Sequence, residues 1–280
     1  MNFFEKILSD LAMQMDSPES YGWFHLMFVF LTIVASVALC CRQRDASDKT
    51  VRLICLVGWL LMVVGEVLKQ IVYTYEIVDG AIVADFQWYA FPYQLCSTPL
   101  YVLPLVIFLK DGLVRDAATA YMIAFSIFGG LCVYVFPGDV FGTNYAVVCL
   151  QTMVHHGLQI VLGVYLASRY RAKLNYKYYL KGGVVFVALL VVAMIMNIAV
   201  HNALASAGID EAFNMFYISP YFDCTLPLLS LIYPKVPYPV FLAIYVVGFI
   251  AAAAIIFYAA KGIVYLLHKA SLEKEIPDEA

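Results

Sequence analysis

Charged residues are scarce in this chain. Asp, Glu, Lys and Arg make up 13% of its 280 residues, whereas hydrophobic residues make up 64%. Soluble globular proteins have about 25% charged and about 45–50% apolar residues, so the composition excludes that class. The apolar residues form continuous runs of about 20, enough to cross a hydrocarbon core of about 30 Å, and lack the alternation of a β-barrel. The sequence therefore predicts an all-α, polytopic helical membrane protein.

Several other features are missing. The start of the chain lacks the basic flank of a cleavable signal peptide, and no internal repeat or second, soluble domain is visible. The net charge of −3 is too small to indicate a nucleic-acid partner. The seven cysteines are odd in number and lie mostly in apolar runs, which argues against a disulfide framework. We therefore expect residues 1–280 to form a single membrane domain, whose oligomeric state the sequence leaves open.

We expect three parts within this domain. Residues 1–21 form an N-terminal segment whose apolar residues follow helical spacing, as in an amphipathic helix at the membrane surface. Residues 22–267 form a bundle of seven transmembrane helices, and residues 268–280 form a tail. The seven spans are expected at about residues 22–41, 51–73, 92–109, 117–136, 145–168, 179–202 and 239–267.

The basic residues are distributed unevenly over the connections. Those between spans one and two, three and four, and five and six, together with the tail, hold 14 of the 17 Lys and Arg residues. Because short cytoplasmic connections carry an excess of these residues, we predict that the N-terminus lies outside and the C-terminus in the cytoplasm. The longest outer connection, residues 203–239, is apolar and contains widely spaced prolines. We expect it to form a short helix or a re-entrant cap over the outer end of the bundle.

Polar side chains occur inside four of the predicted spans, where they are costly. The most polar stretch runs from Gln151 to Gln159 and contains His155 and His156 side by side. At about 1.5 Å per residue, the polar groups of the four spans reach a similar depth in the outer half of the membrane. They are Glu66, Gln94, Cys96, Gln151, His155, His156, Gln159, Asn197 and His201. Their clustering predicts one polar pocket that faces outward.

The spacing on the fifth span indicates which imidazole faces this pocket. Thr152, His156 and Gln159 share a helix face, and Gln151, His155 and Gln159 share a neighbouring one. The first face has more small and polar members and favours His156, with His155 in reserve. A purely structural role for the two histidines, as hydrogen-bonding groups between helices, is open as well.

A cysteine and a histidine at compatible depth are the minimal pair for thiol nucleophilic catalysis. The imidazole can accept the thiol proton, and the thiolate of Cys96 can take an acyl group as a thioester. Gln94 or Gln151 could donate hydrogen bonds to the oxyanion, and Glu66 or Asn197 could orient the imidazole. The two residues of the pair lie on different spans, so no local motif fixes their geometry.

Three other interpretations use the same pocket. A carrier or channel could bind a solute or relay protons there, and a seven-helix sensor could bind a lipid without chemistry. A metal ion could be held by Cys96, His156 and His201, but no tight ligand motif supports such a site. We therefore expect neither a metal nor a cofactor.

Short motifs in order along the chain carry a resemblance to a known family. They are Phe91-Pro-Tyr-Gln-Leu-Cys-Ser97, Phe128-Gly-Gly130, Phe136-Pro137, His156-Gly157 and Asn214-Met-Phe, within about residues 86–239. Through them the chain resembles the YwaF-type bacterial membrane proteins, which are related to the eukaryotic transmembrane protein 164. That protein is known as a lipid acyltransferase that acts through a cysteine and a histidine. The resemblance implies Cys96 as the nucleophile, His156 as its base, a phospholipid acyl chain as substrate, and a bacterial plasma membrane as the location.

The sequence thus favours an integral-membrane lipid acyltransferase or acyl hydrolase, with Cys96 as nucleophile and His156 or His155 as base. The residues expected to bind substrate or support this pair are Glu66, Gln94, Gln151, Gln159, Asn197, His201 and Asn214. The alternative is a non-catalytic carrier or binding protein for a small solute or a lipid. Substituting Ser for Cys96 separates the two, because a carrier should tolerate the change and a thiol acyl-enzyme should not.

Overall fold

The computed structural model describes residues 3–273, and most of them are helical, which confirms the all-α class. Within that range, six helices are long and apolar enough to cross a membrane. They are α2 (Trp23–Gln43), α3 (Asp48–Thr74), the continuous run of α5 (Leu113–Tyr121), η3 (Met122–Ser126) and α6 (Ile127–Val135), α7 (Ala146–Arg169), α8 (Tyr176–Ser206) and α10 (Tyr238–Glu273). Each corresponds to one of the predicted spans.

The third predicted span differs from the expectation. In place of one helix over residues 92–109, the chain forms the 3-10 turn η2 (Leu95–Ser97) and the ten-residue helix α4 (Pro99–Phe108). The cause is Pro99, which has no N–H for the Leu95 carbonyl and would clash with it in a continuing helix. That carbonyl accepts a hydrogen bond from the Thr98 hydroxyl instead, at 2.6 Å. In the described part of the chain the bundle thus has six full-length helices and one shorter apolar helix, and the seventh transmembrane passage stays a prediction.

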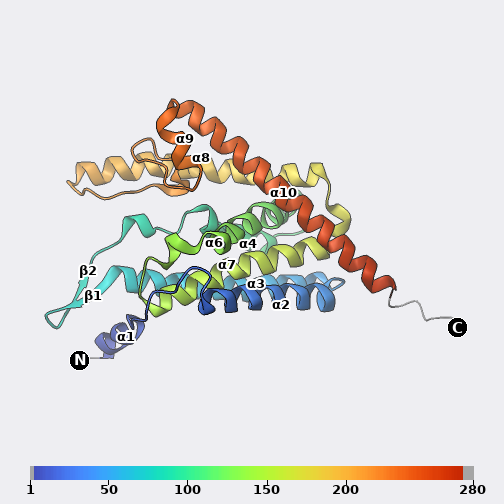
Figure 1. Cartoon of the computed structure of the whole chain (residues 1–280), viewed down its shortest axis with the longest axis horizontal. Helices are drawn as coiled ribbons and strands as arrows, with labels where there is room; N and C mark the ends of the chain where they lie inside the picture. The colour runs from blue at the N-terminus through green and yellow to red at the C-terminus, as the bar shows by residue number, and fades with distance from the viewer. Residues whose placement is uncertain (1–2, 274–280) are drawn as a thin grey trace.

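Helix α7 is the centre of the bundle (Figure 1). It packs against α2, α3 and α6, and most of its side chains are buried. The helix α8 packs on α5 at the far side, and α10 crosses the bundle diagonally. The outer helices expose large apolar side chains such as Phe30, Val64 and Ile195, which water would not favour but lipid would. The molecule is therefore a multi-pass integral membrane protein.

Ion pairs gather at the end of the bundle where α2 ends and α3 begins. Arg52 and Arg115 both contact the carboxylate of Asp48, and Lys173 and Lys181 both contact that of Asp116. These ion pairs link the short connections to one another. One of those connections contains η5 (Arg171–Lys173), between α7 and α8. This end is the one that the distribution of basic residues predicts to be cytoplasmic.

The opposite end carries a β-hairpin that was not predicted. Strands β1 (Tyr75–Val78) and β2 (Ala81–Ala84) pair antiparallel beyond the end of α3 (Figure 1). Asp79 and Gly80 form the turn, with φ of 51° and 77°, a backbone conformation that Asp and Gly tolerate best. The hairpin is followed by η1 (Trp88–Ala90), and η4 (Pro137–Phe141) precedes α7 at the same end.

The N-terminal segment is helical, as the spacing of its apolar residues predicted. Helix α1 (Phe3–Leu11) buries Leu8 and leaves Phe3 and Phe4 72% and 70% exposed. It lies at the hairpin end of the molecule, beside β1 (Figure 1). Exposed aromatic side chains at this level suit a membrane interface.

The long outer connection folds back into the bundle, as expected for a re-entrant cap. It contains η6 (Met215–Tyr217), α9 (Leu229–Ile232) and η7 (Tyr233–Lys235). Its apolar side chains Phe213, Met215, Phe216 and Ile218 are completely or almost completely buried. The segment therefore covers the hairpin end of the bundle beside η2.

Candidate catalytic site

Cys96 lies in η2, directly before α4, and the backbone of this residue contacts α7. Its carbonyl oxygen accepts two hydrogen bonds, from His155 Nε2 at 2.9 Å and from Gln159 Nε2 at 2.7 Å. His155 and Gln159 are one helical turn apart, so their side chains leave α7 on the same face. The predicted proximity of a cysteine and a histidine thus occurs through the Cys96 backbone, and His155 makes the direct contact.

The irregular chain around Cys96 needs such partners, because water does not reach backbone groups inside a membrane protein. Neighbouring helices supply several of them. Trp59 of α3 donates to the Leu100 carbonyl at 2.8 Å, and the Thr98 hydroxyl lies 2.5 Å from the Tyr121 hydroxyl. Side chains from α3, α5 and α7 therefore hold the turn in place.

The hydrogen bonds fix the tautomer of each neutral imidazole. A carbonyl oxygen can only accept, so His155 carries its proton on Nε2 and its lone pair on Nδ1. His156 Nδ1 lies 2.7 Å from the Thr152 carbonyl oxygen, which leaves the lone pair of His156 on Nε2. Each ring therefore keeps one nitrogen that can accept a proton.

Three buried polar atoms between residues 155 and 159 of α7 have no hydrogen-bond partner within residues 3–273. They are His155 Nδ1, His156 Nε2 and Gln159 Oε1, on side chains at most 6% exposed. An unpaired buried polar atom costs about 1–3 kcal/mol, and most are paired for that reason. The stretch of α7 that contacts the Cys96 carbonyl therefore holds three polar atoms that no other described residue pairs.

The thiol of Cys96 is a free, partly buried group. It forms no hydrogen bond with either imidazole in the described part of the chain, since the two nitrogens with lone pairs are unpaired there. Catalytic hydrogen bonds are often long in a free enzyme and shorten when the substrate binds. A hydrogen bond between the Cys96 sulfur and a ring nitrogen would therefore need a change in the position of one of them.

A pair of glycines in α6 forms the wall opposite α7. A methyl group on Gly130 would lie 2.7 Å from the carbonyl oxygen of His156, and one on Gly129 would lie 3.6 Å from Cα of Cys96. Only a hydrogen at residue 130 lets the backbones of α6 and α7 approach this closely. The glycines thus bring three segments together around Cys96.

A carboxylate lies on the α3 side of the site. Glu66 is 6% exposed and accepts from Gln70 Nε2 at 2.8 Å and from Gln151 Nε2 at 3.3 Å, and it pairs with Lys69 Nζ at 2.8 Å. Glu66 and Lys69 are also within electrostatic range of Cys96 and His156. Gln151 therefore interacts with the carboxylate, and Glu66 forms no hydrogen bond with an imidazole within residues 3–273.

Three further predicted residues hold the outer connection rather than the imidazoles. Gln94 donates from Nε2 to the Asn214 carbonyl and accepts at Oε1 from the Phe216 N–H, at 2.9 and 2.7 Å. Asn197 accepts from the Met215 N–H and donates to its carbonyl, at 2.7 and 3.0 Å. The Asn214 side chain accepts from Ser219 N–H and donates to the Asp223 carbonyl. These contacts hold η6, where Phe216 and Tyr217 have strained φ values of 58° and 56°.

A cavity of about 370 Å³ lies beside these hydrogen-bonded residues, at the same end of the bundle. The lining residues are Tyr89, Gln94, Ala212, Asn214, Tyr217, Phe222, Asp223 and Thr225. Gln94 borders the cavity and is two residues from Cys96. His201 belongs neither to the residues around Cys96 nor to the residues that line this cavity. Its ring stacks on the ring of Tyr221, with centroids 3.7 Å apart.

The comparison with protein families decides the relationship. The model of the TMEM164 family matches residues 17–261. The chain belongs to the TMEM164 family. The match includes Cys96, both imidazoles, the glycine pair and the outer connection. It confirms the predicted relationship with transmembrane protein 164. The assignment to the bacterial branch stays a prediction. Comparison with curated proteins and with solved structures gave no match.

Several residues of this TMEM164 family chain were missed as parts of the site. Gly129 and Gly130 entered only through a motif, although a Gly-Gly pair in an apolar span indicates close helix contact. Ser126 ends η3, a π-helical stretch that packs against η2, and its buried hydroxyl has no partner among the described residues. Such π-helical insertions are frequent at functional sites, but no sequence pattern indicates them.

The residues considered as metal ligands are not assembled. Within residues 3–273, no three His, Cys, Asp or Glu residues lie close enough to share a metal ion. Of the trio suggested by the sequence, His201 stacks on Tyr221 and His156 bonds to Thr152.

Proposed function

We propose that this TMEM164 family protein transfers or hydrolyses a phospholipid acyl chain, with Cys96 as the nucleophile. The observation that supports it is the set of unpaired, buried atoms on the stretch of α7 that contacts the Cys96 backbone: two imidazole nitrogens and one amide oxygen. A thiol and a proton acceptor are the parts that thioester chemistry requires. The family relationship raises the expectation without supplying the reaction.

In the proposed reaction an imidazole nitrogen takes the proton of the Cys96 thiol. The thiolate attacks the ester carbonyl carbon of the lipid, and the oxyanion collapses with cleavage of the ester C–O bond. The leaving alcohol takes the proton from the imidazolium, and the acyl group stays on sulfur as a thioester. Water or a second hydroxyl then attacks the thioester, with the same imidazole as base, and the thiol is regenerated.

Two histidines divide the work in this proposal. His155 donates from Nε2 to the Cys96 carbonyl and so orients the turn that carries the nucleophile. His156 offers the unpaired Nε2 as the base, in line with the spacing on α7. Gln94 is already engaged with Asn214 and Phe216, so its amide acts on the outer connection and not on the oxyanion.

The proposed topology places this site near the outer face of the membrane. Seven passages are proposed, of which the third consists of the irregular chain around η2 followed by α4, with the N-terminus outside. The cavity beside Gln94 then opens outward, and Tyr89, Tyr217 and Phe222 of its lining suit contact with an acyl chain. Gln94, Asn214 and Thr225 of the same lining can form hydrogen bonds with the polar part of the lipid.

Intact-protein mass spectrometry tests the proposal. Purified protein in detergent is incubated with phospholipid, and wild type is compared with Cys96→Ser, His156→Ala and, as a matched control, Cys132→Ser, which removes another partly buried free thiol. We expect a hydroxylamine-labile acyl adduct on wild type and Cys132→Ser and none on Cys96→Ser. Loss of lipid turnover in His156→Ala supports the assigned base.

The carrier interpretation predicts a different result from the same set of proteins. A carrier forms no acyl adduct, and its Cys96→Ser variant still binds lipid or solute as wild type does. An adduct that persists in Cys96→Ser, or equal absence of turnover in all folded variants, would overturn acyl transfer at this cysteine.

A further inference from the structure

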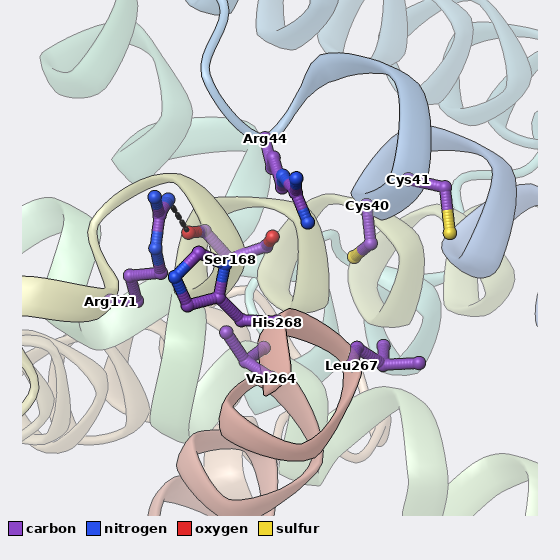
Figure 2. Close-up of a pocket in the computed structure, with 8 residues that line it drawn as sticks. All are labelled: Cys40, Cys41, Arg44, Ser168, Arg171, Val264, Leu267 and His268. Atoms are coloured by element: carbon purple, nitrogen blue, oxygen red, sulfur yellow. Dashed lines mark hydrogen bonds between the residues drawn. The ribbon is translucent and has the colours of Figure 1, made fainter. Parts of the chain in front are cut away.

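A second cavity lies at the opposite end of the bundle from the hairpin, and the proposed acyl transfer does not use it. Its volume is about 250 Å³, and it is formed by the ends of α2, α7 and α10 together with η5. The lining residues, drawn in Figure 2, are Cys40, Cys41, Arg44, Ser168, Arg171, Val264, Leu267 and His268.

One side of this cavity is cationic. Arg44 and Arg171 extend toward Ser168 and His268, and Arg171 donates to the Ser168 carbonyl at 3.2 Å (Figure 2). Both guanidinium groups contact the carboxylate of Asp45, at 3.1 and 2.9 Å. Asp45 is 63% exposed and lies outside the lining, and none of the eight lining residues is acidic. The cavity therefore presents two guanidinium groups, which share the carboxylate of Asp45, and an imidazole.

The other side of the cavity is apolar. Cys40, Cys41 and Leu267 lie on the side opposite Arg171, and Val264 lies below the imidazole (Figure 2). Beyond this side, α2 and α10 expose apolar side chains toward the membrane, such as Val37 at 45% and Ile263 at 54%. The cavity is thus amphipathic, with its charged part near the membrane surface and its apolar part continuous with the lipid-facing helices.

We infer that this cavity binds an anionic phospholipid, with its phosphate on Arg44, Arg171 and His268 and an acyl chain against Cys40 and Leu267. Guanidinium groups bind phosphate oxygens through charge-assisted and often bidentate hydrogen bonds. Basic pockets between transmembrane helices on the cytoplasmic side suit anionic head groups, which are abundant in that leaflet. A soluble phosphate would match the arginines but leave the apolar side empty.

Native mass spectrometry of the full-length protein in detergent tests the inference. It is titrated with dioleoyl phosphatidylglycerol and, separately, with dioleoyl phosphatidylcholine, inorganic phosphate and glycerol 3-phosphate. We expect phosphatidylglycerol to bind first and more tightly than phosphatidylcholine. In Arg44→Gln/Arg171→Gln its affinity should fall by about tenfold or more, because the phosphate loses its charge-assisted hydrogen bonds to both guanidinium groups. The control Arg42→Gln/Lys49→Gln removes the same charge outside the cavity and should stay within about twofold of wild type.

A second pair of variants keeps the ion pairs intact. Cys41→Trp places an indole at an exposed lining residue, and Leu266→Trp places the same indole at an exposed residue of α10 outside the lining. We expect weaker lipid binding in the first and unchanged binding in the second. Equal affinities in the arginine variant and its charge control, equal binding of the two lipids, or binding of either soluble phosphate as tight as that of the lipid would each overturn the inference.

Discussion

His155 Nε2 lies 2.9 Å from the carbonyl oxygen of Cys96, so a side chain 59 residues away holds the backbone of the proposed nucleophile. Gln159 donates to the same oxygen at 2.7 Å, which makes the position of Cys96 depend on α7. A residue with this role acts through geometry, whereas a base acts through its lone pair. The two roles can be separated by substitution.

Glutamine places an amide N–H about where a histidine places Nε2, but it cannot act as a base at neutral pH. If His155 positions the turn, His155→Gln keeps the hydrogen bond to Cys96 and should retain most of the acylation rate. His155→Ala loses the hydrogen bond, and its acylation rate should fall by about 10–100-fold, the usual cost of removing an orienting contact at a catalytic centre. Rates of adduct formation measure both.

The corresponding variants of His156 serve as the contrast. His156→Gln and His156→Ala should lose activity equally, by about 10²–10⁴-fold, because both lack the proton acceptor. The reverse pattern, with His156→Gln active and His155→Gln inactive, would assign the base to His155.

The glycine wall leads to a stability prediction. In Gly130→Ala the new methyl group lies 2.7 Å from the His156 carbonyl oxygen, which is backbone and cannot move aside easily. We expect overpacking to destabilise the protein by about 1–3 kcal/mol, measured by unfolding in detergent. In Gly183→Ala nothing lies within 4 Å, and the higher helix propensity of Ala should leave stability equal or raised by up to about 1 kcal/mol. A Gly130→Ala protein as stable as wild type would contradict the close approach of α6 and α7.

Much of the fold could be predicted because length and apolar composition determine a transmembrane helix. The six long helices coincide with predicted spans for that reason. The third span was predicted too long, because its apolar residues continue across Pro99 while its hydrogen bonds do not. The hairpin was missed although Asp79-Gly80 between two apolar, β-branched runs is its usual signal. Helical runs on both sides obscured a pattern of only four residues per strand.

The candidate site was predicted less completely, because depth in a membrane does not determine direction around a helix. Cys96, His155 and Gln159 were placed at one depth and do meet. Asn197 was placed at a similar depth, but it faces η6 and bonds to Met215. The difference lies in a contact between α8 and the outer connection that no local spacing encodes.

The contact between Asn197 and Met215 predicts that substitution of Asn197 lowers stability locally. The side chain is completely buried and makes two hydrogen bonds to the backbone of Met215, so Asn197→Ala leaves a donor and an acceptor unpaired. We expect a loss of about 2–4 kcal/mol, since each unpaired group costs about 1–3 kcal/mol. Hydrogen exchange should accelerate in residues 212–219 above all. Asn202→Ala, at an exposed position of the same helix, is the control and should leave exchange in this segment unchanged.

The pair of Glu66 and Lys69 permits a test by double substitution. Glu66→Gln leaves the Lys69 ammonium without its carboxylate, 2.8 Å away in the native protein, at a side chain that is 15% exposed. Breaking a buried pair from one side costs about 3–5 kcal/mol, whereas replacing both charges is often nearly neutral. We therefore expect Glu66→Gln to lower the free energy of unfolding, and Glu66→Gln/Lys69→Met to recover more than half of that loss. A double variant less stable than Glu66→Gln would contradict this pairing. Lys69 would then have an anionic partner other than Glu66, and the Glu66 carboxylate would be free to act on the site around Cys96.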